Sequence, residues 1–347
     1  MNLRIFSVFF SLLIAVGCTV YNQYPIDIYK PGEVIFPPSV EKAVIVSRNF
    51  KYSADTLLHF YKDNYSLVKA KNDPADLDSL LTTICIKELA ANLSDNNVFA
   101  DLHVFPYRTF EKHSGEHLSE FSRGLIEQIA SATDADLLIS LDTYSSFFSS
   151  YPESWDSPET NEVITVAVWS IYNPLKKSLI ERKTMIDTIY WNGYDDEGNF
   201  RKGFRLPSRL SALEQASAIA GENYAKRFYA GWQTVNRLYS VPPLPEFSEA
   251  ARYFEEGEWN KAIRLWQKYA GDRNGKTAIH ARYNLALAFE MKDDLETAQK
   301  WLNAALELAT KYRNKEDLKM ILKYREILNN RQKETLKLKM LNENFSD

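Results

Sequence analysis

The spacing of hydrophobic residues separates the chain into an α/β part and an all-helical part. Short apolar runs between residues 41 and 240, such as Ala43-Val44-Ile45-Val46, predict buried strands. These runs alternate with stretches in which apolar residues recur every three or four positions, which predicts helices. Residues 162–172 and 179–191 are two β-rich runs joined by turn residues, so they predict an antiparallel hairpin. A long helix is expected over Arg209–Tyr239.

These elements predict an α/β domain over residues 41–240. The order strand, helix, strand, helix, strand favours parallel neighbours joined by crossovers, and the hairpin adds antiparallel strands. We therefore expect a three-layer-like arrangement of helices around a mixed sheet of about five strands. The order of elements resembles that of the small envelope α/β domains of Tol-type translocation proteins and curli-type secretion lipoproteins.

Two proline-rich segments flank this domain. Residues 18–40 contain four prolines. Because proline fixes φ and removes a hydrogen-bond donor, this segment is expected to be an extended tether. Residues 241–246 contain three prolines, which cannot continue a helix and predict a stiff linker.

The last part of the chain, residues 247–347, has a helical pattern that repeats after 36 residues. Small, aromatic and turn positions recur, with Ala250, Tyr253, Gly257, Trp259, Ala262 and Trp266 matching Ala286, Phe289, Asp293, Leu295, Ala298 and Leu302. The pattern resembles the tetratricopeptide repeat, and Glu316–Met340 is expected to be a capping helix. This resemblance implies stacked helical hairpins that form a groove for a protein partner. The aromatic residues expected to contact the partner are Tyr253, Trp259, Trp266, Tyr283, Phe289 and Trp301.

The first 17 residues have the layout of an export signal. A positively charged start precedes the apolar run Ile5–Val16, which is too short to span a bilayer. Cys18 follows Ala15-Val16-Gly17, and this resembles the lipobox of bacterial lipoproteins. The resemblance implies cleavage before Cys18 and lipidation of its sulfur, so that the membrane would be reached through the lipid. Thr19 in the next position favours the outer membrane. Residues 19–23 lack the acidic export signal of surface lipoproteins, which favours the periplasmic face.

Composition and charge narrow the function classes. The chain has 347 residues, 45% of them hydrophobic, and a net charge of −4. This mild acidity provides no basic field for nucleic acid, so no nucleic-acid partner is expected. Cys85 lies among apolar neighbours at helical spacing and is expected to be a small buried hydrophobe.

Two features suggest specific chemistry. The string His113-Ser114-Gly115-Glu116-His117 matches the H-x-x-E-H pattern of inverted zinc peptidases. That chemistry needs both histidines one turn apart on a helix, and we favour surface residues at a helix start over a metal site. Aromatic residues in the expected loops 145–160 and 192–207 either bind a glycan or a protein partner, or cover the core: Phe147, Phe148, Tyr151, Trp155, Tyr194 and Phe200.

The lipobox, tether, α/β domain and repeats together resemble an uncharacterised lipoprotein family of Bacteroidetes-type bacteria. The sequence favours a non-enzymatic scaffold that binds an envelope protein, identity unknown, through the helical repeats. The alternative is a glycan- or peptidoglycan-binding module that uses the aromatic loops, and a zinc hydrolase is a less favoured alternative. No catalytic residue and no cofactor are predicted.

Overall fold

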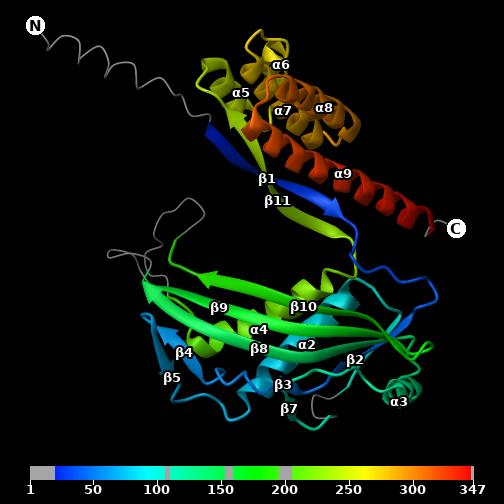
Figure 1. Ribbon diagram of the computed structural model, residues 1–347. Helices are drawn as coiled ribbons and strands as arrows, with labels where there is room; N and C mark the ends of the chain where they lie inside the picture. The colour runs from blue at the N-terminus through cyan, green and yellow to red at the C-terminus, as the bar shows by residue number, and fades with distance from the viewer. Residues whose placement is uncertain (1–19, 106–109, 153–158, 195–204, 345–347) are drawn as a thin grey trace, which may run out of the picture. The chain divides into compact units, whose positions relative to one another are not determined.

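A computed structural model describes residues 20–105, 110–152, 159–194 and 205–344, which form two compact units (Figure 1). One unit comprises residues 32–229. The other joins the described residues before Gly32 to those from Ala230 onwards. The predicted succession of an α/β part and a helical part is therefore present, but the unit boundaries differ from the predicted 41–240 and 247–347. Within the described ranges, no helix combines the length and apolar character needed to cross a membrane.

The α/β unit is built on a curled mixed sheet of seven strands. The order is β10-β9-β8-β2-β6, with β4 beside β8 and β5 beside β4. β2 is parallel to β6 and β8, whereas β8, β9 and β10 are antiparallel neighbours. The strands are β2 (Lys42–Ser47), β4 (Phe60–Asp63), β5 (Ser66–Lys69), β6 (Asp101–Val104), β8 (Leu137–Pro152), β9 (Glu159–Asn173) and β10 (Ser178–Trp191). Outside this sheet, β3 (Phe50–Tyr52) pairs with β7 (His113–Gly115) in parallel.

Helices cover both faces of the sheet. α2 (Leu77–Asp95) and α4 (Arg209–Ala225) pack on one face, and α3 (Arg123–Thr133) packs on part of the other. The contact of α2 with α4 is close, because a Cβ at Gly221 would lie 2.2 Å from the carbonyl oxygen of Cys85. Cys85 is buried at this contact, as its apolar setting in the sequence predicts. The main core of the unit therefore lies between these two helices and the sheet.

The second unit combines a two-stranded ribbon with five helices. β1 (Val20–Lys30) pairs antiparallel with β11 (Gly231–Val241) over its whole length. The helices are α5 (Pro245–Glu255), α6 (Trp259–Tyr269), α7 (Gly275–Met291), α8 (Leu295–Lys311) and α9 (Lys315–Asn344). α5 and α7 contact β11, and α9 contacts β1. The ribbon therefore packs on alternate helices of the array, and we call this unit the helical unit.

The ribbon corrects two expectations. Residues 20–30 are a paired strand rather than part of an extended tether, and the helix expected over Arg209–Tyr239 ends at Ala225. Residues 231–241 form a strand instead, because they pair with β1 over its whole length and the two strands satisfy each other's backbone groups. Pro25 is tolerated because a two-stranded ribbon needs only half of its N–H groups for pairing.

A long hairpin corrects a third expectation. β8 continues to Pro152 and pairs with β9 throughout, so residues 145–152 are strand rather than loop. Phe147 lies opposite Ile164, and Phe148 lies opposite Val163. The run of serines and aromatic residues is typical of a loop in composition, but cross-strand pairing with the β-rich run of β9 outweighs that preference.

The 36-residue repeat has a clear structural counterpart. Gly257 after α5 and Asp293 after α7 both have positive φ, 77° and 57°. The N–H of the residue after each turn reaches back five residues, from Glu258 to the Tyr253 carbonyl and from Asp294 to the Phe289 carbonyl. The four repeated alanines are fully buried: Ala250, Ala262, Ala286 and Ala298. The two helical hairpins are therefore built on the same turn and the same small contact residues.

Candidate functional site

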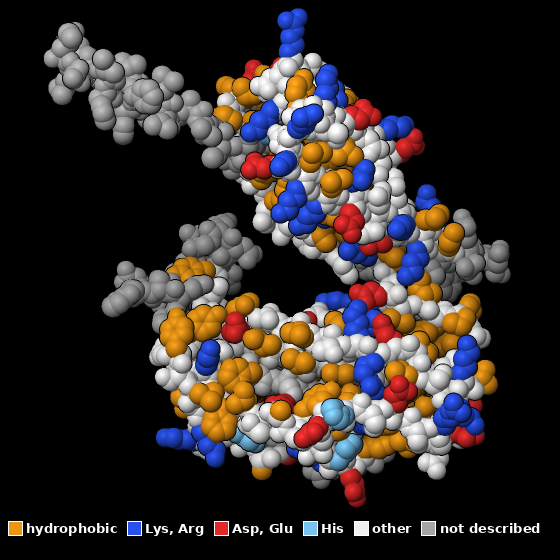
Figure 2. All heavy atoms as spheres, viewed as in Figure 1, with side chains coloured by type: hydrophobic (Ala, Val, Ile, Leu, Met, Phe, Trp, Pro, Cys, Tyr) orange, Lys and Arg blue, Asp and Glu red, His pale blue; other side chains and the backbone are white. Residues whose placement is uncertain are grey.

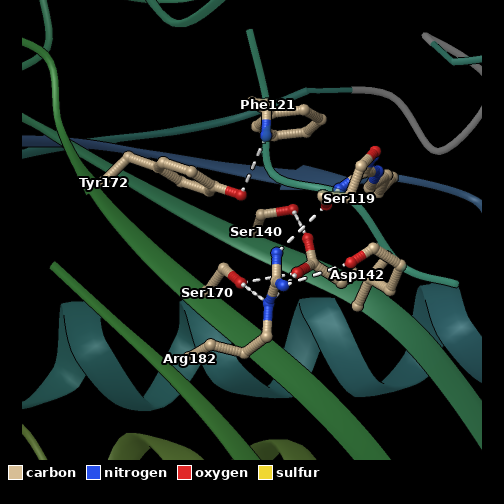
Figure 3. A network of polar contacts seen from close by, with 9 residues as sticks. Ser119, Phe121, Ser140, Asp142, Ser170, Tyr172 and Arg182 are labelled. Carbon is tan, nitrogen blue, oxygen red and sulfur yellow. Dashed lines mark hydrogen bonds and ion pairs between the residues drawn. The ribbon is translucent and has the colours of Figure 1, made fainter. Parts of the chain in front are cut away.

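A buried carboxylate lies at an irregular point of the α/β sheet (Figure 3). The pairing of β8 with β9 shifts register between Leu141 and Thr143, which places Asp142 at a bulge. Its side chain is fully buried and accepts hydrogen bonds from Ser140 (2.7 Å) and Ser170 (2.5 Å). Arg182 Nε lies 3.3 Å from Asp142 Oδ2. Burial raises the pKa of Asp142, while the two serine hydrogen bonds and Arg182 oppose that rise.

Two arginines connect this carboxylate to the segment before α3. Arg182 donates from Nη2 to the Ser119 carbonyl at 3.1 Å, and Arg48 donates to the same carbonyl and, at 3.0 Å, to the Ser119 hydroxyl. The N–H of Phe121 donates to the Tyr172 hydroxyl at 3.2 Å. The network therefore holds residues 119–121 against β2, β9 and β10.

The space beside Asp142 is small. A cavity of about 10 Å³ is lined by Asp142 and by the hydroxyl-bearing residues Ser47 and Thr143. The hydroxyl oxygens of Ser47 and Thr143 are buried and have no hydrogen-bond partner among the described residues. A volume of this size holds about one water molecule, which would satisfy such hydroxyls. We therefore interpret the Asp142 network as a structural connection, since nothing larger than water reaches it through this cavity.

The HSGEH string does not have the geometry of a zinc peptidase. His113 belongs to strand β7, its ring packs edge-on against Phe50, and α3 begins only at Arg123. His113, Glu116 and His117 are exposed and do not lie on a common helix. No group of three or more His, Cys, Asp or Glu side chains in the described part of the chain is placed to hold a metal ion. The helix start that the sequence places at this string lies further along the chain, because Ser122 caps α3 by accepting a hydrogen bond from the Leu125 N–H.

The aromatic residues predicted in the loops 145–160 and 192–207 differ in how far they are exposed. Phe148 is buried in the core, and Phe147 and Tyr151 lie half-buried on β8. Tyr151 donates a hydrogen bond to Glu162 at 3.4 Å. Tyr194 is half-buried as well. Trp155 and Phe200 lie outside the described residues, as does Cys18 with the predicted lipidation site.

The predicted partner-binding residues of the helical unit also divide into two groups. Trp266 and Tyr283 are 1% and 5% exposed and belong to the core, so they have no surface to offer a partner. This corrects the expectation for these two residues. Half-buried positions are occupied by the other four, Tyr253, Trp259, Phe289 and Trp301.

The ribbon occupies the side of the array on which α5, α7 and α9 lie. Arg237 of β11 forms hydrogen bonds to buried Glu290 of α7 at 2.8 to 3.2 Å. Asn284 of α7 accepts from the Ser240 N–H at 2.8 Å and donates to the Ser240 carbonyl at 2.7 Å. The Asn284 amide thus bonds both backbone groups of Ser240, as a neighbouring strand would otherwise do. The chain thus fills with its own ribbon the surface that the repeat resemblance assigns to a partner.

An open groove remains at one end of the ribbon. It measures about 400 Å³ and its rim includes Asp27, Tyr29, Trp232, Met291, Asp293 and Leu338. We call it the ribbon groove. Trp232 is 72% exposed, and its ring packs against that of Tyr29, the residue opposite it in the ribbon, with centroids 5.3 Å apart. The groove therefore presents a large aromatic surface beside two acidic side chains.

A buried arginine lies at the floor of the ribbon groove. Arg331 of α9 is 8% exposed, and its Nε has no hydrogen-bond partner among the described residues. Nε lies 3.8 Å from Glu290 Oε1, and Nη2 lies 3.5 Å from Asp293 Oδ1. The arginine partly neutralises Asp293 and Glu290, and Arg237 also pairs with Glu290. The exposed acidic side chains at the rim are Asp27 and Asp293.

Sequence reasoning missed this groove for a specific reason. The proline pattern assigns Tyr29 to the tether, and the helical pattern assigns Trp232 to the helix over Arg209–Tyr239. The signal that reveals Tyr29 is the two-residue alternation of residues 26–29, where Ile26 and Ile28 are buried while Asp27 and Tyr29 are exposed. Trp232 has no such signal, because the apolar residues Trp232, Val235, Leu238 and Val241 recur every three positions.

Known proteins provide limited comparisons. No curated protein shows a significant match to the chain. Among solved structures, the PelC dodecamer from Paraburkholderia phytofirmans matches with 10% identity and a TM-score of 0.24, covering 60% of this chain and 99% of that chain. A neuraminyllactose-binding hemagglutinin homolog from Helicobacter pylori matches with 11% identity and a TM-score of 0.26, covering 58% of this chain and 87% of that chain.

Two family models match different parts of the chain. A domain of unknown function, DUF6340, matches residues 248–330 in the helical unit. Another domain of unknown function, DUF8603, matches residues 40–240, which is more than half of the chain. The chain therefore belongs to the DUF8603 family.

Proposed function

We propose that the protein is a non-enzymatic interaction scaffold of the cell envelope that binds a protein partner through its helical unit. In this proposal Cys18 carries the lipid that anchors the chain to the outer membrane, with the protein facing the periplasm. The α/β unit is a three-layer-like domain, and the helical unit is a tetratricopeptide-like array with α9 as its capping helix. The repeated turns at Gly257 and Asp293 and the four buried alanines support this assignment.

The ribbon groove is the proposed contact surface. Because the ribbon covers the inner side of the array, a partner that entered there would have to displace the Arg237–Glu290 ion pair and the Asn284 hydrogen bonds. Displacement of a buried ion pair costs several kcal/mol, on the order of 3 to 5. Binding at the groove requires no such displacement. The single observation that carries the proposal is the 72% exposure of Trp232, a residue type that commonly dominates protein interfaces.

The chemistry of the rim favours a segment with a positively charged side chain. Asp27 and Asp293 provide negative charge in the groove that Trp232 and Tyr29 also line, and Asp293 is 77% exposed. A lysine or arginine placed over an indole ring gains about 0.5 to 2 kcal/mol from the cation–π interaction. Met291 and Leu338 offer apolar surface for its aliphatic part or for a neighbouring residue. The proposed partner segment therefore combines a basic residue with an apolar one.

A crosslinked pull-down from native envelopes tests the proposal. The full-length protein should recover one protein partner, and Trp232→Ala should lose it. Tyr65→Ala is the matched control, because Tyr65 is 74% exposed and belongs to the α/β unit. Asp27→Asn should weaken recovery, and added salt should do the same for the unaltered protein.

The outcomes separate this proposal from the alternatives. Recovery of the same protein by the Trp232→Ala variant would contradict binding at the ribbon groove. Recovery of cell-wall glycan by all variants would instead favour the glycan-binding alternative, which depends on residues 145–160 and 192–207 of the α/β unit.

A further inference from the structure

β10 is one edge strand of the α/β sheet, and it is unusually suited to pairing. It contains 14 residues, and its only register shift in the pairing with β9 lies between Leu179 and Glu181. Beyond that bulge, residues 181–191 are regular and contain no proline. Edge strands in soluble proteins are usually short or interrupted, because their unpaired N–H and C=O groups can bind another strand.

The side chains on the outer face of this edge are mostly uncharged. The exposed positions after the bulge include Thr184, Ile186, Thr188 and Tyr190, and Ile186 is 66% exposed. Ile186 lies opposite Val166 of β9, and Thr188 lies opposite Ile164. Hydrophobic side chains gather over β8, β9 and β10 on the face seen in Figure 2. The edge thus has an apolar flank that further burial would stabilise.

The opposite face of the same edge carries one unsatisfied charged atom. Asp187 Oδ1 accepts a hydrogen bond from Asn223 at 2.8 Å, whereas its Oδ2 is buried and has no hydrogen-bond partner among the described residues. Lys183, four residues earlier, is on the same face and bonds to Glu33 at 2.6 Å. A buried carboxylate oxygen without a donor is costly, so a cation that approached from the strand edge would be favoured.

We propose that β10 pairs antiparallel with β10 of a second copy of this chain, with Met185 on the two-fold axis. Directly opposite residues of an antiparallel pair share a face, so the axis must pass through a residue. With Met185 on the axis, Lys183 lies opposite Asp187 of the second copy, and this pairing occurs twice. Thr184 then lies opposite Ile186, a β-branched pair on the apolar face.

Other registers are less favourable. An axis at Lys183 or at Asp187 would place two like charges directly opposite each other, and an axis at Thr184 would place Glu181 opposite Asp187. Pairing centred on Met185 also uses residues 181–189, which is the regular part of the strand beyond the bulge. An axis at Ile186 brings no like charges together, but it leaves Lys183 opposite Ile189 and Asp187 opposite Met185. The Met185 register is therefore the one that pairs Lys183 with Asp187.

Sedimentation velocity of the full-length protein over a concentration series tests the proposal. Pairing of one strand buries less than the roughly 1,600 Å² of a standard interface, so a dimer that forms in the micromolar range is expected. Ile186→Lys should shift the protein to monomer at every concentration. Leu175→Lys is the matched control, because Leu175 is 91% exposed in the turn between β9 and β10 and the charge change is the same.

Disulfide formation between the two copies tests the register of the β10 pairing. The double variant Thr184→Cys with Ile186→Cys should form disulfide-linked dimers under mild oxidation, because these positions lie opposite each other across the axis. Monomeric behaviour of the unaltered protein throughout the series would overturn the proposal. A dimer that persists with Ile186→Lys, or an oxidised double variant that stays monomeric, would overturn it as well.

Discussion

At the residue scale, substitutions in the two copies of the repeated turn should change the free energy of unfolding in opposite directions. Asp293 has φ 57°, a conformation that costs an L-residue free energy but costs glycine almost none. Asp293→Gly should therefore raise the free energy of unfolding by about 0.5 to 1 kcal/mol, since the contact of Asp293 with buried Arg331 is long, at 3.5 Å, and Asp293 itself is 77% exposed. Gly257→Ala should lower it by about 1 kcal/mol. Urea denaturation measures the free energy of unfolding of both variants. A loss of stability in Asp293→Gly would contradict the strain assigned to this turn.

A second residue-scale prediction concerns pH. Burial alone would raise the pKa of Asp317, but hydrogen bonds from His280 and Tyr21, both 3.0 Å, together with the charge of His280, hold it below its usual value. A depressed pKa in the folded state contributes stability above about pH 4, and this contribution is lost as pH falls through the folded pKa.

Asp317→Asn should accordingly lower the free energy of unfolding at pH 7 by about 1 to 3 kcal/mol. The difference from the unaltered protein should shrink as the pH is lowered below about 4. Thermal unfolding followed by circular dichroism between pH 3 and 7 measures both effects. A difference that stays constant across this range would contradict the assigned role of the carboxylate.

At the element scale, two glycines in helices should respond in opposite directions. Gly221 of α4 lies against the Cys85 carbonyl of α2, so Gly221→Ala forces the helices apart and should cost about 1 to 3 kcal/mol. A methyl group added at Gly124 of α3 would meet no neighbouring atom within 4 Å, so Gly124→Ala should stabilise by up to about 1 kcal/mol. Chemical denaturation of the two variants compares them directly. Equal effects would show that helix propensity, rather than the close contact, dominates at Gly221.

The helices of the helical unit can be predicted from the sequence, whereas its ribbon cannot. The local signals were sufficient for α7, α8 and α9 and for the turn at Gly257, because helices depend on contacts within a few residues. The ribbon escaped prediction because Val20 pairs with Val241, far apart in the sequence. Val235 and Leu238 are three residues apart and fit a helical pattern, so the strand follows only from its pairing with β1.

The candidate site also depends on pairing between segments that lie far apart in the sequence. Trp232 and Tyr29 are brought together by the register of the ribbon, so neither position marks a site in the linear sequence. The Asp142 network depends equally on a bulge and on two arginines far apart in the sequence, Arg48 just after β2 and Arg182 in β10. Residue types alone identified the aromatic run 147–151, but strand pairing decides that Phe148 faces the core.

At the scale of the whole molecule, the two units have separate hydrophobic cores. Ile28 of β1 is 2% exposed in the helical unit, and Ile139 of β8 is fully buried in the α/β unit. Each substitution to alanine should cost about 2 to 4 kcal/mol in the unit that holds the residue. Differential scanning calorimetry should show Ile28→Ala and Ile139→Ala lowering different transitions. One shared transition lowered equally by both would contradict a division into two cooperative units.

The central claim is that a protein partner binds at the ribbon groove. Its most direct test is site-specific photo-crosslinking in native envelopes, with a photoreactive phenylalanine analogue at position 232 and, as control, at position 65. We predict one crosslinked envelope protein from position 232, attached beside a lysine or arginine, and no such product from position 65. The same products from both positions, or lipid and glycan adducts alone from position 232, would contradict the account.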